Sequence, residues 1–278
     1  EAEGVRIGVH TLTNFLTTND AYVTPKPDPR LMRVGSARLV EAVDAAARDI
    51  LVDDPAPFAE KGDLSAVVVG DEIIQYRAVS DEAPWTLLGC RRGAFDTTAS
   101  AHAAGADAGK LADHSYRVFF PDIDMQADVV ARLVELFETC GLRQISFDGL
   151  EGCRYTCHGM YAHHLFVQQF YDGCSAEVLN DASRLLHTLW HIHTRMNWGE
   201  PWGKPTRDGQ AEYRFRNQAY FERNLFPRML GWFQLRLAGG DVEATSLADI
   251  EWMLSKAAGY DAGFALVAGV DSLTGKGQ

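Results

Sequence analysis

The chain has 278 residues, of which 46% are hydrophobic and 10% aromatic, so it can bury a sizeable core and has the composition of a globular protein. Its 26 basic and 38 acidic residues give a formal net charge of −12 at pH 7. Nucleic acids and anionic membrane surfaces bind to clustered positive charge. Because this sequence contains no Lys/Arg run, we expect neither of them to be a partner. No segment approaches the roughly 18 uninterrupted apolar residues of a membrane-spanning helix, and we expect no membrane insertion.

The first predicted element is a short β-branched strand at 5–10, which ends at His10 and is followed by polar residues that include Asn14. This pattern is typical of a buried parallel strand that delivers polar side chains to the mouth of a site. Three alternating prolines at 25, 27 and 29 then exclude helix and central strand, so they mark the exit into another unit.

The second region, from about 34 to 113, consists of short apolar runs separated by Gly, Asp and Pro turn signals. We expect strands at 49–53, 66–69, 72–76 and 85–89, which together predict an inserted all-β module over 21–113. Its last part contains Arg92-Gly93, Thr97 and His102 in the spacing R-G-x3-T-x4-H. This signature resembles one found in small β-modules of phage-tail and carbohydrate-active proteins.

Strand and helix patterns alternate in the rest of the chain. Strands are expected at 116–120, 144–148, 176–181, 229–234 and 262–268, and helices at 124–140, 160–171, 213–223 and 247–257. Repeated βα units predict a parallel sheet, and polar residues at the ends of several strands favour a (β/α)8 TIM-type barrel over an open sheet. In this interpretation residues 1–20 and 114–278 form the barrel around the inserted module. Fewer than 200 residues remain outside the module, against the ~250 of eight βα units, so either part of the barrel lies outside this chain or the sheet is open.

The most informative stretch is Asp148-Gly149-Leu150-Glu151-Gly152, in which an apolar strand ends in a carboxylate followed by two glycines. This arrangement predicts a fixed carboxylate with room beside it for a ligand. Asp148 is the main catalytic candidate, and Glu151 either supports it or takes part directly. Asp181 ends the next strand in the same way. Paired carboxylates are what cleavage of a glycosidic bond requires.

Tryptophan, histidine and hydrogen-bonding side chains are concentrated between 187 and 202. Tryptophan faces can stack on sugar rings, and Arg, Asn and Glu side chains can hydrogen bond to sugar hydroxyls. Glu200 is a further catalytic candidate. The predicted substrate-binding residues are His10, Asn14, His187, His191, Arg195, Asn197, Trp198 and Trp202.

The sequence offers little support for a metal or a cofactor. The five cysteines are too sparse for a disulfide framework, and the C-x3-C pair Cys153 and Cys157 has no second pair, so unpaired thiols are the favoured interpretation. The histidine pairs lack a third ligand at the spacing of a metalloenzyme, and the motifs of serine hydrolases, NTPases and dinucleotide enzymes are missing. We therefore predict neither a metal nor a cofactor.

Gly8-Val-His-Thr11 and Phe147-Asp-Gly149, with the strand and helix rhythm around them, are similar to bacterial barrel glycosidases of the α-galactosidase superfamily type. The resemblance implies a polysaccharide-degrading hydrolase in which Asp148 is the nucleophile and Asp181 or Glu200 is the acid/base. It also implies a periplasmic or secreted enzyme. The opening Glu-Ala-Glu-Gly has no start Met and no apolar signal region, so we expect any targeting segment to be absent or removed.

Two alternatives remain open. The module favours a non-catalytic glycan-binding or attachment protein, and the histidine cluster favours a metal-dependent polysaccharide hydrolase or lyase. The sequence does not indicate the oligomeric state.

Overall fold

A computed structural model describes residues 4–59, 62–182, 189–192, 195–196, 206–240 and 243–274. The chain divides into two compact units, each built from discontinuous segments. The first unit comprises Glu1–Leu12, Leu136–Leu150 and Cys174–Gln278, and the second comprises Thr13–Glu135 and Glu151–Gly173. That the module at 21–113 forms a domain of its own remains a prediction. The second unit groups its strands with two further helical segments, one at each of 123–135 and 151–173.

The first unit contains a parallel sheet of four strands in the order β1-β12-β13-β14. The strands are β1 (Gly8–Leu12), β12 (Gln144–Asp148), β13 (Leu179–Ala182) and β14 (Arg195–Met196). The strand predicted at 144–148 is confirmed, and those predicted at 5–10 and 176–181 overlap β1 and β13. The sheet therefore brings together segments that are more than 130 residues apart in sequence.

The entry into β12 is set by the end of the helix α2 (Ile123–Cys140), which confirms the helix predicted at 124–140. Gly141 adopts a left-handed backbone with φ 64°, and the Leu142 amide donates to the Phe137 carbonyl at 3.1 Å. A glycine in this conformation closes a helix without the steric cost that a side chain would have. The chain thus leaves α2 and enters β12 within a few residues.

The two faces of β12 differ because side chains alternate along a strand. Ile145 and Phe147 are fully buried on one face. Ser146 and Asp148 project from the other face, so the strand combines an apolar face with a polar one.

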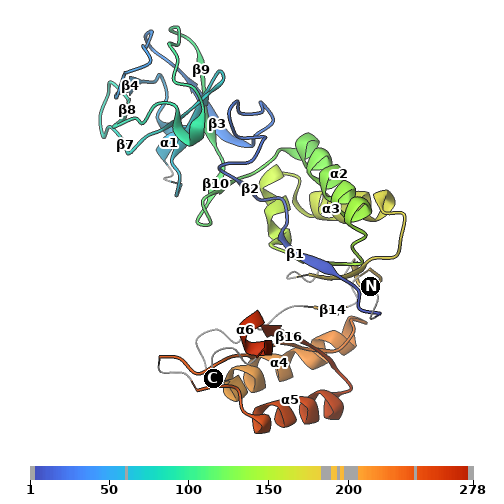
Figure 1. Cartoon of the computed structure of the whole chain (residues 1–278). Helices are drawn as coiled ribbons and strands as arrows, with labels where there is room; N and C mark the ends of the chain where they lie inside the picture. The colour runs from blue at the N-terminus through green and yellow to red at the C-terminus, as the bar shows by residue number, and fades with distance from the viewer. Residues whose placement is uncertain are drawn as a thin grey trace. The chain divides into compact units, whose positions relative to one another are not determined.

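The C-terminal part of the first unit pairs β15 (Met229–Leu235) with β16 (Gly263–Ala268) in parallel. Helices α4 (Thr206–Arg223) and α5 (Leu247–Tyr260) accompany this pair, and α6 (Val270–Thr274) follows it (Figure 1). Phe221, Phe226 and Met229 form its buried apolar cluster. The elements predicted at 213–223, 229–234, 247–257 and 262–268 are confirmed.

The second unit is dominated by antiparallel sheets. Strands β3 (Arg33–Arg38), β9 (Asp107–Leu111), β5 (Ala66–Val69) and β6 (Glu72–Gln75) form one sheet, and β4 (Ile50–Leu51), β8 (Thr86–Leu88) and β7 (Ala78–Val79) form another. The short helix α1 (Ala56–Ala59) lies with these strands (Figure 1). The unit also contains η1 (Ala94–Asp96), most of η2 (Leu150–Thr156) and α3 (Gly159–Gly173), which confirms the helix predicted at 160–171.

The R-G-x3-T-x4-H signature forms a buried cluster around the fully buried carboxylate of Glu72. Arg92 donates to both carboxylate oxygens, from Nε at 2.9 Å and from Nη2 at 2.8 Å. The amides of Gly93 and Ser100 donate at 2.8 and 3.1 Å, and His102 Nε2 lies 2.7 Å from Oε2. The signature is therefore explained by structure, since it fastens the segment 92–102 to the start of β6.

The predicted (β/α)8 barrel is wrong. Among the described residues, the parallel strands form one open sheet of four and one pair, and the remaining sheets are antiparallel. One reason why the strands do not form a barrel is the pairing of the strand predicted at 116–120, which is antiparallel. A tight turn closed by the hydrogen bond from the Arg117 amide to the His114 carbonyl folds β11 (Val118–Phe119) back onto β10 (Asp113–His114), and β11 also pairs antiparallel with β2 (Leu16–Thr17).

Within the described ranges, no helix is both long enough and apolar enough to span a membrane.

Candidate functional site

The candidate site lies on the polar face of the parallel sheet, near the C-terminal ends of β1 and β12. His10 is the register partner of Ser146, and Ser146 is the register partner of Asp181. Register partners on neighbouring strands project to the same face, and so does Asp148, two residues beyond Ser146. We refer to His10, Ser146, Asp148 and Asp181 as the polar row. In open parallel sheets, ligand sites form at this edge.

Three hydrogen bonds fix the accessible part of the polar row. His10 Nδ1 lies 2.9 Å from Ser146 Oγ, and His10 Nε2 lies 3.1 Å from Asp148 Oδ2. The Gly149 amide donates to Asp148 Oδ1 at 2.9 Å. Both carboxylate oxygens of Asp148 are therefore held from the protein side.

The His10 ring can meet these contacts in two protonation states. A neutral ring can accept from the Ser146 hydroxyl at Nδ1 and donate from Nε2 to Asp148, and a protonated ring can donate from both nitrogens. In each state Nε2–H points at the carboxylate. The side chains of His10 and Asp148 are 45% and 30% exposed, so this pair stays accessible from solvent while Ser146, at 4%, lies beneath it.

Ser146 was not predicted from the sequence as a site residue. The signal was present, since a serine stands between two buried apolar residues at the same alternate position as Asp148. Its contact with His10 depends on the pairing of β1 with β12, and that pairing could not be read from either segment alone.

Asp181, the predicted second carboxylate, lies on the same face as Ser146 and is fully buried. A substrate in solvent does not reach it in this conformation. The backbone of Arg195 continues the register on β14 as the partner of Asp181.

The other predicted residues are distributed differently. Glu151 lies in η2, in the second unit, and is partly exposed. Asn14 also belongs to the second unit, where it is 2% exposed and donates from Nδ2 to Gln126 Oε1 at 3.1 Å, a contact that attaches the chain after β1 to α2. His191 is exposed, and its ring lies edge-on to Trp190 at 5.6 Å. His187, Asn197, Trp198, Glu200 and Trp202 lie outside the described residues.

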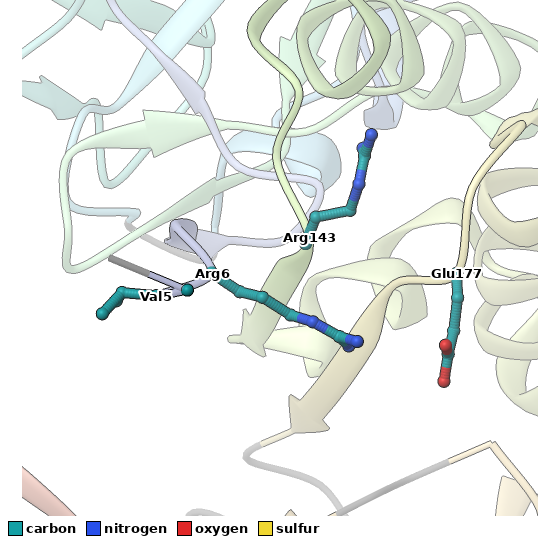
Figure 2. A pocket seen from close by; sticks show the side chains of 5 residues that line it. Val5, Arg6, Arg143 and Glu177 are labelled. Carbon is teal, nitrogen blue, oxygen red and sulfur yellow. The ribbon is translucent and has the colours of Figure 1, made fainter. Parts of the chain in front are cut away.

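A pocket lies at the opposite, N-terminal ends of β1, β12 and β13. It has a volume of about 330 Å³ and is lined by Gly4, Val5, Arg6, Arg143 and Glu177. Figure 2 shows Arg6 extending towards the segment that carries Glu177, while Arg143 points away from it. The lining combines two arginines with a glutamate, and this edge of a parallel sheet is not where ligand sites form.

Within the part of the chain that the structure describes, no three His, Cys, Asp or Glu side chains gather closely enough to hold a metal ion. The five cysteines are unpaired, with Cys153 buried and Cys157 exposed.

Comparison of the chain with models of protein families, with curated proteins and with solved structures found no match.

Proposed function

We propose that this chain is a glycoside hydrolase in which Asp148 either attacks the anomeric carbon as the nucleophile or removes a proton from the water that attacks it. The observation that carries the proposal is the Asp148 carboxylate itself. It lies at the end of a buried strand, is partly exposed, and has one oxygen held by an amide and the other by His10. Cleavage of a glycosidic bond needs a carboxylate fixed in this way beside the sugar ring.

The roles of the neighbouring residues follow from their contacts. His10 and the Gly149 amide orient the carboxylate, and Ser146 orients His10 through Nδ1. These residues position Asp148, and each carboxylate oxygen still has lone-pair capacity for a substrate or a water. Orientation of the attacking group reduces the entropy that must be lost on reaching the transition state.

Hydrolysis also requires a general acid for the leaving oxygen. Because Asp181 is fully buried, it is poorly placed to touch a leaving group, and we assign this role to Glu200. Asp181 then serves the site as a buried neighbour of Ser146. A carbohydrate is proposed as the substrate because the sequence of 195–202 contains Trp, Asn and Arg residues, which can stack on sugar rings or hydrogen bond to their hydroxyls.

The test begins with the full chain and a panel of poly- and oligosaccharides, with release of reducing ends as the readout. On an active substrate, Asp148→Asn should lower kcat by at least about 10²-fold while the circular dichroism spectrum stays unchanged. Glu177→Gln is the matched control, since this carboxylate lies at the opposite edge of the same sheet. Near-wild-type activity of a folded Asp148→Asn variant would refute the assignment.

A nitrophenyl glycoside separates the two carboxylates, because a good leaving group needs no protonation. Glu200→Gln should retain much of its activity on such a substrate, whereas Asp148→Asn should not. Binding of glycans without any turnover by the wild-type chain would favour the non-catalytic attachment protein instead.

A further inference from the structure

A pocket of about 410 Å³ lies in the second unit, between α1 and the segment from 76 to 85. This volume falls within the range of small-molecule sites, roughly 300–1,000 Å³. Its apolar lining includes Phe58, Tyr76, Val79 and Trp85, and its polar lining includes Arg77 and Asp81. We call it the Trp85 pocket.

The floor of the Trp85 pocket is part of the packed core. Phe58 and Tyr76 are 1% and 5% exposed, and their rings meet edge to face at 5.9 Å. Val79 and Trp85 pack against the same buried cluster and stay partly exposed. A pocket built on core side chains is formed before any ligand arrives, which lowers the entropic cost of binding.

Hydrogen bonds also fix the segment that carries Trp85. The Val52 amide donates to the Trp85 carbonyl at 2.9 Å. Ser80 Oγ accepts from the Thr86 amide at 2.9 Å and donates to the Glu82 carbonyl at 3.0 Å. The indole is thus presented at the pocket by an ordered turn.

The rim supplies hydrogen-bonding groups of both kinds. Arg77 and Asp81 are exposed, and the described parts of the chain offer neither side chain a hydrogen-bond or ion-pair partner. The guanidinium can only donate, and the carboxylate can only accept. Because their charges are opposite, they suit a neutral ligand with several hydroxyl groups better than an anion or a cation.

We propose that the Trp85 pocket binds one neutral pyranose unit of a glycan, with the sugar stacked on the Trp85 ring and its hydroxyls bonded to Arg77 and Asp81. A pocket with an aromatic face and opposed donor and acceptor groups matches a sugar, which has an apolar C–H face and polar edges. The proposal concerns binding without chemistry, and it stands apart from catalysis at Asp148.

The test measures binding of cellotetraose, maltotetraose, chitotetraose and a galactotetraose to the full chain by calorimetry. At least one of these probes should bind saturably, and Trp85→Ala should weaken its binding by about tenfold or more. Arg77→Ala changes an exposed side chain and should weaken the same binding, so it keeps the test valid if Trp85→Ala fails to fold. Arg38→Ala, at an exposed arginine outside the pocket, is the matched control and should bind as wild type.

Three results would overturn the proposal: no saturable binding of any of the four sugars, unchanged binding in both pocket variants, or Trp85-dependent binding of a proline-rich peptide in place of a sugar. The experiments distinguish a failure of this proposal from a failure of the proposed hydrolysis at Asp148. Trp85→Ala should still hydrolyse a small nitrophenyl glycoside, and Asp148→Asn should still bind the tetraose in the Trp85 pocket.

Discussion

The buried carboxylate of Glu72 allows the sharpest prediction about stability. Glu72→Gln keeps the size of the side chain and removes its charge, while Arg92 stays 6% exposed with its guanidinium facing the substituted group. The new amide nitrogen is a donor, so it also opposes some of the groups that now donate to the carboxylate. Removing one partner of a buried ion pair costs about 3–5 kcal/mol.

Hydrogen exchange of the full chain can locate this loss. A decrease of about 3–5 kcal/mol in the free energy of opening corresponds to exchange that is faster by roughly 140- to 4,000-fold. The acceleration should appear in peptides from 65–111, where the strands around Glu72 lie. The control is Asp71→Asn, which removes an exposed ion pair with Lys26 and should cost no more than about 1 kcal/mol. Exchange of 65–111 in Glu72→Gln at the wild-type rate would refute the reasoning.

The same cluster predicts a dependence on pH. Burial by itself raises the pKa of Glu72, but hydrogen bonds from Arg92, Gly93, His102 and Ser100 together hold this pKa below its ordinary value of 4.5. A pKa that is lower in the folded state than in the unfolded state stabilises the fold above the ordinary value. This contribution is lost as the pH falls below 4.5 and through the folded-state pKa. The acid sensitivity of exchange in 65–111 should therefore be smaller in Glu72→Gln.

Two further predictions concern local structure. Ser246 accepts from the Asp249 amide and forms a capping box at the start of α5. Ser246→Ala should therefore destabilise this helix by about 1 kcal/mol, measured as faster hydrogen exchange in its first turn. Unchanged exchange there would contradict the role of the cap. Burial raises the pKa of the Cys90 thiol to about 12 and that of the Cys153 thiol further, whereas Cys140 and Cys157 are exposed. A disulfide reagent at pH 8 should therefore label the exposed pair first and the buried pair only after denaturation. Rapid labelling of all five thiols would show that Cys90 and Cys153 are accessible to solvent, contrary to the structure.

Local patterns in the sequence predicted most elements of the fold. The stretch 144–148 forms β12 because its apolar alternation fits a strand with one buried face, and α2 ends where Gly141 permits a left-handed residue. The carboxylate at the end of β12 was likewise identifiable, since Asp148 and the glycine after it stand out after an apolar strand. These features depend on residues close together in the chain.

The tertiary structure decided how the strands associate. The four-stranded open sheet, the hairpin that removes 116–120 from it, and the contact of His10 with Ser146 and Asp148 all depend on pairing between distant segments. Strand pairing is set by backbone hydrogen bonds and by burial, neither of which is written in the alternation of a single segment. The sequence alone therefore identified Asp148 as a strand-end carboxylate. Only the tertiary structure placed His10 beside it, through the pairing of β1 with β12, and made Asp181 a buried neighbour of Ser146, through the pairing of β12 with β13.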